Sequence, residues 1–238
     1  PLSVSLRLGF HRLADLLIAK GAALDARSDS GQTLLHLACA GGNKKVAELL
    51  LARGADLEAR DNDGATPLLS AVDFGRPAQV EMLLGRRARL DAKTKLGCSA
   101  LHLAAQGRQG YSDPPPPDAD YAAVAELLLR HGADIRAVLA SRGAQPLHIA
   151  AVHGNTAVAR VLLERGAPVD DRDNYDQTPL FIAVEGGRAD LVKLLIGRGA
   201  NPKLRALGGV TALHAAAGSG NLELLQLFLS LGLDVNAD

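Results

Sequence analysis

The stretch Ser30-Gly-Gln-Thr-Leu-Leu-His-Leu-Ala38, continued by Val46-Ala-Glu-Leu-Leu-Leu-Ala-Arg-Gly-Ala-Asp56, decides how this chain of 238 residues folds, because variants of it fill the sequence. The variants align on one marker position, which is occupied by Gly31, Gly64, Gly97, Gly143, Asp176 and Gly209. Successive markers are separated by 33, 33, 46, 33 and 33 residues. A period of 33 residues, interrupted once, predicts a repeat protein, in which each copy is one supersecondary unit that packs against its neighbours.

Each copy carries the signals of two helices. A hydroxyl residue such as Thr33 is suited to cap the first helix, and a proline such as Pro67 fits its first turn. A leucine in this helix is followed three residues later by an alanine that allows close helix packing, at Ala38, Ala71, Ala104, Ala150, Ala183 and Ala216. An apolar triplet marks the second helix, and a glycine in the left-handed conformation ends it. Arg87 replaces this glycine in one copy, where we expect a strain of about 1 kcal/mol unless that helix ends differently.

The motifs Gly64-Ala-Thr-Pro-Leu68 and Asp176-Gln-Thr-Pro-Leu180, each followed by an apolar triplet, resemble the ankyrin repeat family. The resemblance covers essentially the whole chain and implies an all-α repeat solenoid, with a helix-turn-helix and a protruding β-hairpin in every repeat. It also implies one ankyrin repeat domain over residues 1–238, with about seven repeats of which the first is truncated. The expected repeats are 1–27, 28–60, 61–93, 94–138, 139–172, 173–205 and 206–238.

Two regions depart from the regular pattern. The fourth repeat contains an insert over residues 107–120, in which Pro114 to Pro117 predict an extended polyproline segment. This insert is either a plain surface loop or a ligand for a polyproline-binding domain. In the last repeat, Leu222 and Leu231 stand where the second repeat has Lys44 and Arg53. Terminal repeats normally present a polar outer face to solvent. One interpretation is that the natural chain continues past Asp238 or that another molecule covers this end, and the other is that the final repeat tolerates an apolar outer face.

Composition limits the function classes. The 26 basic and 26 acidic residues balance, so the sequence predicts neither nucleic-acid binding nor attraction to an anionic membrane. It contains no apolar run long enough for membrane insertion and no signal peptide, and Pro1 in place of Met suggests a fragment of a longer chain. Cys39 and Cys98 are either free thiols, which favours a cytoplasmic or nuclear setting, or a disulfide between repeats. We expect this segment to be monomeric.

Residues of catalytic or metal-binding type have simpler structural explanations. His36, His102, His148 and His214 occupy equivalent positions in different repeats, and helices spaced about 8–10 Å apart cannot bring them to one metal ion. We expect each histidine to bond near the neighbouring hairpin, as the resemblance implies. Asp61 to Gly64 lacks most of a calcium loop, and Asp170, Asp171 and Asp173 are interpreted as a solvated loop tip. The sequence therefore predicts no enzyme, no metal and no cofactor.

The resemblance places partner binding on the hairpin tips and first helices, which together form a concave groove. The groove positions of this chain that we expect to contact a partner protein or peptide are Asp29, Asn62, Asp63, Asp73, Phe74, Lys95, Gln106, Arg142, His153, Asn174, Tyr175 and Glu185. Gln177, Leu207 and Val210 line the same predicted face. Phe74 and Tyr175 are either interface anchors, as aromatic residues often are, or covers for their own repeats.

The predicted function is a non-catalytic protein–protein interaction module. The alternative is a targeting or regulatory domain of a larger enzyme or channel, or a groove that holds a small ligand or catalyses a reaction. An enclosed pocket with convergent polar groups would favour a small ligand, whereas an open, shallow groove would favour a protein.

Overall fold

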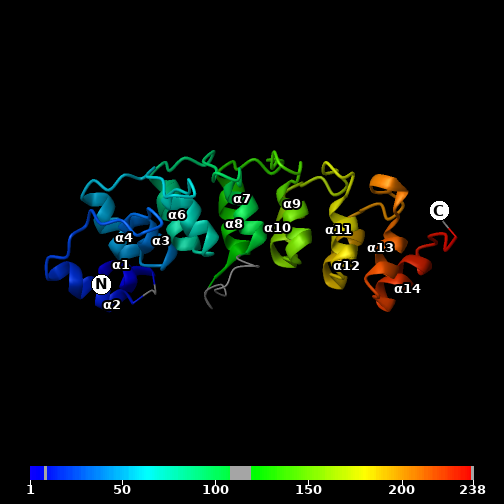
Figure 1. The fold of residues 1–238 in the computed structure, drawn as a ribbon, viewed down its shortest axis with the longest axis horizontal. Helices are drawn as coiled ribbons and strands as arrows, with labels where there is room; N and C mark the ends of the chain where they lie inside the picture. Colours follow the sequence, from blue (N-terminus) through cyan, green and yellow to red (C-terminus); the bar gives the residue numbers. More distant parts are fainter. Residues whose placement is uncertain (8–9, 108–118, 237–238) are drawn as a thin grey trace. The chain divides into compact units, whose positions relative to one another are not determined.

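The structure, a computed structural model, describes residues 1–7, 10–107 and 119–236, and in these residues the regular secondary structure is helical (Figure 1). The chain divides into two compact parts, which we call the N-terminal body (Pro1–Ala133) and the C-terminal body (Asp134–Asp238). The N-terminal body contains α1 (Leu2–Arg7), α2 (His11–Ala19), α3 (Leu34–Ala40), α4 (Lys44–Ala52), α5 (Pro67–Asp73), α6 (Pro77–Gly85), α7 (Ala100–Gln106) and α8 (Tyr121–Arg130). The C-terminal body contains α9 (Pro146–His153), α10 (Thr156–Glu164), α11 (Pro179–Glu185), α12 (Ala189–Gly197), η1 (Leu207–Gly209), α13 (Ala212–Gly218) and α14 (Leu222–Ser230). The predicted all-α repeat fold is confirmed.

The core of each body lies between the helices of successive repeats. In the N-terminal body α3 packs on α4 and α5, and in the C-terminal body α11 packs on α9, α12 and α13. The small residues of the first helices are fully or almost fully buried at these contacts, as at Ala71 and Ala183. In the second helices after α2 the middle member of the apolar triplet is buried, as at Leu83 and Leu162, whereas Leu17 of α2 is half-buried. Neighbours in the triplet are turned by about 100° around the helix, so most of them keep partial contact with solvent.

The helix starts follow the capping chemistry expected from the sequence. Thr33 Oγ1 accepts the N–H of His36, and the His36 Nδ1 accepts the N–H of Thr33 at 3.1 Å. The other ring nitrogen, Nε2, bonds the carbonyl of Ala65 in the next repeat at 3.0 Å. His148 repeats this arrangement with the N–H of Gln145 and the carbonyl of Asp171. The structural role predicted for these two histidines is confirmed.

Burial also changes the pKa of the same two histidines. Desolvation lowers the pKa of His36 and of His148, although nearby carbonyls and aspartates act in the opposite direction. A neutral imidazole that accepts at Nδ1 carries its proton on Nε2, so Nε2 donates to the neighbouring carbonyl. Each buried histidine therefore joins its own helix start to the following loop.

The second helices end in left-handed residues, and Arg87 does so without a glycine. Its φ is 64°, whereas Gly54 and Gly132 at equivalent ends have φ of 85° and 88°. The N–H of Arg87 bonds the carbonyl of Leu84, so the helix end closes as the glycine ends do. The left-handed conformation expected at Arg87 is confirmed, and its cost stays a prediction. A second case occurs at the marker position, where Asp176 has φ of 56°.

The connections between repeats are tight turns, and the β-hairpins expected from the resemblance do not form regular strands in the described residues. One isolated antiparallel bridge joins Arg27 and Thr33. Each loop is short and bends at a left-handed marker, so it closes through few bonds, such as that from the N–H of Asp61 to the carbonyl of Ala65. One backbone bond also links neighbouring loop tips, in the pairs Asn62 to Ser30, Lys95 to Asp63, Asn174 to Arg142 and Leu207 to Tyr175.

A series of arginines reinforces these loops, which we call the arginine staples: Arg27, Arg60, Arg172 and Arg205. The Arg60 Nη1 donates to the carbonyl of Gly64 in its own loop at 2.8 Å and to the carbonyl of Lys93 in the next loop at 3.0 Å. Arg27 and Arg172 make the same two kinds of bond, and Arg205 bonds its own loop. Sequence reasoning missed this feature, although an arginine four residues before the marker recurs in four copies.

The irregular regions are described only in part. Most of the insert, residues 108–118, lies outside the described residues, but Asp120 caps α8 through a bond from the N–H of Ala123 to its carboxylate. On α14 Leu222 is 65% exposed, and Leu231 just after the helix is also exposed, in agreement with the apolar outer face read from the sequence. Cys39 and Cys98 are both free thiols, and burial raises the pKa of each.

Candidate interaction site

Four predicted contact residues of the N-terminal body lie at loop tips. The side chains of Asp29, Asn62, Asp63 and Lys95 are exposed, while their backbones take part in loop-to-loop bonds. Asn62 also uses its side chain for this purpose, because its Nδ2 donates to the carbonyl of Asp29 at 3.1 Å. These positions therefore support the loops and at the same time present polar groups to solvent.

The other three predicted residues of this body lie at the ends of first helices. Asp73 is the last residue of α5 and Phe74 follows it as the C-cap, while Gln106 ends α7. All three are half-buried. The phenolic O–H of Tyr121 donates to the carbonyl of Asp73 at 3.0 Å, which ties the start of α8 to this helix end. Phe74 therefore offers only part of its side chain to a partner.

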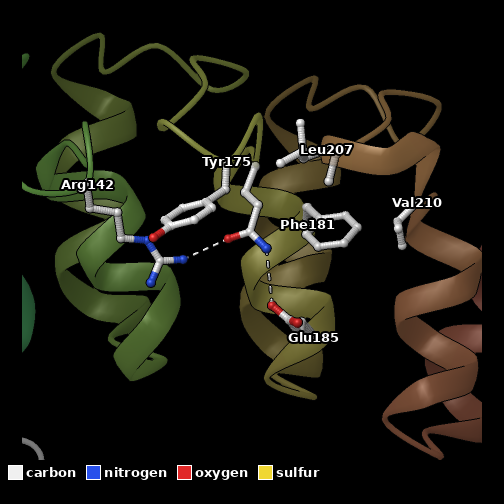
Figure 2. A pocket seen from close by; sticks show the side chains of 8 residues that line it. Arg142, Tyr175, Phe181, Glu185, Leu207 and Val210 are labelled. Atoms are coloured by element: carbon white, nitrogen blue, oxygen red, sulfur yellow. Dashed lines mark hydrogen bonds between the residues drawn. The ribbon is translucent and has the colours of Figure 1, made fainter.

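In the C-terminal body, three predicted residues come together in one open pocket of about 440 Å³ (Figure 2). Arg142, Tyr175 and Glu185 line it together with Gln177, Phe181, Ala206, Leu207 and Val210. Gln177 and Phe181 come from the start of the α11 segment, and Glu185 ends that helix. The two other predicted residues of this body, the half-buried His153 and the exposed Asn174, are not lining residues of this pocket.

Asp173 organises the polar side of the pocket. Its carboxylate accepts the N–H groups of Tyr175 and Gln177 at 2.9 and 3.0 Å and the Nε of Arg142 at 3.0 Å. Its side chain has no exposed surface. The interpretation of Asp173 as part of a solvated tip is therefore wrong, because the turn directs its own N–H groups at the carboxylate and a guanidinium balances the charge.

A chain of polar contacts crosses the pocket from Arg142 to Glu185, as Figure 2 shows. The Arg142 Nη2 donates to Gln177 Oε1 at 2.7 Å, and Gln177 Nε2 lies 3.5 Å from Glu185 Oε2. The Arg142 guanidinium also lies over the Tyr175 ring, 5.3 Å from its centroid. The Tyr175 ring is thus held in place on one face, while its side chain remains 52% exposed.

The opposite side of the pocket is apolar. Phe181 of α11 is 6% exposed and forms part of the floor, and Leu207 and Val210 stand beside it at 64% and 38% exposure (Figure 2). Sequence reasoning named Leu207 and Val210 but missed Phe181 and Asp173. Phe181 occupies the position of His36 and His148 in its repeat, and no sequence signal distinguishes Asp173 from its acidic neighbours.

The lining residues include no serine, threonine, cysteine, histidine or lysine. Within the described residues, no group of three or more His, Cys, Asp or Glu side chains is arranged to hold a metal ion. In the same residues, no helix has the length and hydropathy to cross a bilayer. An open pocket with an apolar side and a buried ion pair is suited to hold side chains of another molecule.

Stacked two-helix repeats with a mixed polar and apolar pocket at their loops define a repeat-type scaffold. Family models of ankyrin repeats match residues 2–94 and 118–206 (ankyrin repeats, three copies), 96–138 (ankyrin repeat) and 187–229 (ankyrin repeats, many copies). The chain belongs to the ankyrin repeat family, whose repeats are generally protein-interaction modules.

Solved structures agree with this assignment. The human ASB11 ankyrin repeat domain is 28% identical with a TM-score of 0.78, and the match covers 97% of this chain and 96% of that one. The ankyrin repeat domain of Bcl-3, of the IkappaB family, is 28% identical with a TM-score of 0.68, covering 95% and 97% of the two chains.

One curated relative carries the repeats in a much longer protein. The ADP-ribosylation factor GTPase-activating protein AGD2 of Arabidopsis thaliana is 44% identical over 71 residues. That match covers 30% of this chain and 8% of AGD2.

Proposed function

We propose that this chain is a non-catalytic module that binds a partner protein or peptide through the pocket of the C-terminal body. One observation carries the proposal: Tyr175, Leu207 and Val210 expose apolar surface around Phe181, next to a polar network that is already organised. Tyrosine is enriched among interface hot spots, and a ring held by a guanidinium loses little freedom when a partner binds. The chain has only 3% aromatic residues, so one placed at an exposed pocket is informative.

The shape of the pocket favours a macromolecular partner over a small ligand. Sites for small molecules bury most of the ligand in a concave, largely apolar cavity. Here the pocket opens to solvent, and the polar side chains of Arg142, Gln177 and Glu185 already contact one another. It therefore offers a place for one or two side chains of a larger partner.

The remaining predicted residues extend the proposed contact surface. Exposed side chains at loop tips and half-buried side chains at helix ends meet the requirements of a polar rim, in which individual contacts add little energy. In this proposal His153 and Asn174 belong to the rim of the C-terminal body, and the N-terminal body presents a contact surface of its own at Asp29, Asn62, Asp63, Asp73, Phe74, Lys95 and Gln106. Two free thiols support a reducing compartment, so we place the module in the cytoplasm or nucleus.

The similarity to AGD2 supplies a second candidate, in which these repeats are a targeting or regulatory domain of a larger protein. That candidate also uses the module for binding, so it does not change the experiment. The GTPase-activating activity named for AGD2 belongs to a protein of which the match covers 8%, and it is not transferred to this chain.

The test is a comparison of captured partners. Wild-type protein and a Tyr175→Ala, Leu207→Ser double variant are used in parallel pull-downs that are analysed by quantitative mass spectrometry. Arg160→Glu, an exposed change on α10 in the same body, is the control for surface charge, and circular dichroism checks folding. We expect specific partners to be retained by wild type and Arg160→Glu and lost by the double variant. Retention of every partner by the folded double variant would refute the proposed site.

A further inference from the structure

We infer that the pocket of the C-terminal body selects an extended peptide segment in which an apolar side chain lies close to a lysine or arginine. This inference rests on the proposed function and adds the chemistry of the partner. It follows from two properties of the groups around the pocket: which apolar side chains remain exposed to water, and which charges already have an oppositely charged partner.

The apolar side of the pocket sets the first requirement. Phe181 is held in the core with only 6% of its surface exposed, whereas Leu207 and Val210 project beside it and are much more exposed (Figure 2). An apolar side chain placed between them would remove exposed surface of all three from water, at about 25 cal/mol per Å². A leucine, isoleucine, methionine or phenylalanine meets this requirement, and a charged side chain does not.

The positive charge of the pocket is already compensated. Arg142 donates to the fully buried carboxylate of Asp173, and its Nη2 donates to Gln177. An acidic ligand would have to draw the guanidinium away from Asp173. That movement would leave a buried carboxylate without its cationic partner, which is strongly unfavourable. Arg142 is therefore a poor receptor for an acidic residue.

The negative charge of Glu185 is not compensated in the same way. Its side chain is exposed at the end of α11, and in the pocket it faces the neutral amide of Gln177, whose Nε2 lies 3.5 Å from Glu185 Oε2. The next basic residue along the chain, Arg188, packs its side chain beside Gly154 and Gly186. Burial, and then the charge of Arg188, lower the pKa of His153. Glu185 stands below Phe181 at the rim of the pocket (Figure 2). A cationic side chain can reach this carboxylate while an apolar neighbour occupies the slot.

The occupant is a peptide segment because the two requirements lie side by side on one open surface. An extended segment presents successive side chains at short intervals and needs no enclosed cavity. The cationic side chain of such a partner is attracted to Glu185, and its binding does not require Arg142 to leave Asp173 or Gln177. Charge complementarity at the rim acts mainly on specificity and on the association rate.

The experiment uses a phage-displayed library of random twelve-residue peptides, selected on the immobilised 238-residue protein. Enriched peptides are then synthesised, and their affinities are measured by fluorescence anisotropy at low and moderate salt. The variants are Leu207→Ser for the apolar slot and Glu185→Gln for the carboxylate. Asp190→Asn, which removes an exposed acidic group from α12, is the matched control.

We expect wild-type protein to enrich peptides that combine an apolar residue with a nearby lysine or arginine. Leu207→Ser should weaken the selected peptides by about tenfold, as a hot-spot truncation does. Glu185→Gln should weaken them about 2- to 5-fold and reduce their salt dependence, because an exposed ion pair contributes little energy. Asp190→Asn should leave the affinity unchanged.

Three results would overturn the inference: enrichment of acidic or uncharged peptides, equal effects of Glu185→Gln and Asp190→Asn, or no enrichment at all. Each can be separated from a failure of the proposed function, because the partner comparison with Tyr175→Ala, Leu207→Ser is an independent measurement. If that comparison shows lost partners while peptide selection fails, the pocket binds a folded surface and the peptide inference is wrong. If both fail, the site itself is wrong.

Discussion

Replacing Arg87 by glycine should stabilise the protein by about 1 kcal/mol. Arg87 has φ of 64° at the end of α6, and a side chain in the left-handed region costs about 1–2 kcal/mol. Glycine removes this cost, but it also makes the unfolded chain more flexible, which lowers the free energy of unfolding by about 0.4–1 kcal/mol. The side chain of Arg87 is exposed. At the equivalent positions Gly54 and Gly132, a side-chain Cβ would have no neighbouring atom within 4 Å, so packing around this position is open. The backbone conformation therefore decides the outcome.

The assay is urea unfolding followed by helical circular dichroism. With a denaturant slope of about 1–3 kcal/mol per M, a gain of about 1 kcal/mol moves the midpoint upward by about 0.3–1 M. The neighbouring change Arg86→Gly is the matched control, because Arg86 is an exposed arginine with φ of −94°. It should leave the midpoint unchanged or lower it. Equal midpoints for Arg87→Gly and Arg86→Gly would show that the left-handed conformation carries no cost here.

Three further changes test other parts of the structure. In urea titrations, wild-type protein should lose stability between about pH 7.5 and pH 5.5, and His148→Asn should reduce this loss. Because the pKa of His148 is lowered in the folded protein, the unfolded chain binds a proton near pH 6.5 before the folded protein does. The stability that the neutral His148 contributes is therefore fully present above that pH and falls below it. Arg60→Met should lower the free energy of unfolding by about 1–2 kcal/mol, because two hydrogen bonds to backbone carbonyls are lost. The control Arg53→Met changes an exposed arginine and should have little effect. Equal effects of the two changes would show that the arginine staples add no stability. Ala71→Leu should cost at least about 2 kcal/mol in chemical denaturation because Ala71 is fully buried where repeats meet, and an unchanged midpoint would mean that the contact is not tightly packed.

The fold was predictable because local chemistry and repeat spacing lead to the same structure. Thr66 and Pro67 start a helix by local rules, Ala71 permits the next helix to approach, and Gly54 ends a helix where φ must be positive. Even the exception at Arg87 was visible, since the alignment of copies requires a left-handed residue at that position. Each of these signals depends only on nearby residues and on the period of 33.

The pocket was predictable only in part, because its organisation depends on contacts between repeats. Arg142 was named as an exposed cation for a partner, but a carboxylate 31 residues later holds it. Asp173 looks like its neighbours Asp170 and Asp171 in the sequence, and only the turn shows that its carboxylate faces three donors. The β-hairpins came from family resemblance, and the short turns of this chain do not provide enough paired residues for strands.

The loop-to-loop bonds have a consequence for how freely this surface can change over evolution. The arginine staples donate to backbone carbonyls, and these carbonyls belong to residues as different as Gly64, Lys93 and Asp176. The bonds between loop tips likewise use backbone N–H groups, which come from Asn62, Lys95, Asn174 and Leu207. A carbonyl or an amide proton is the same whichever side chain is attached to it. Tip side chains can therefore be exchanged to recognise a different partner while the framework that holds them stays intact.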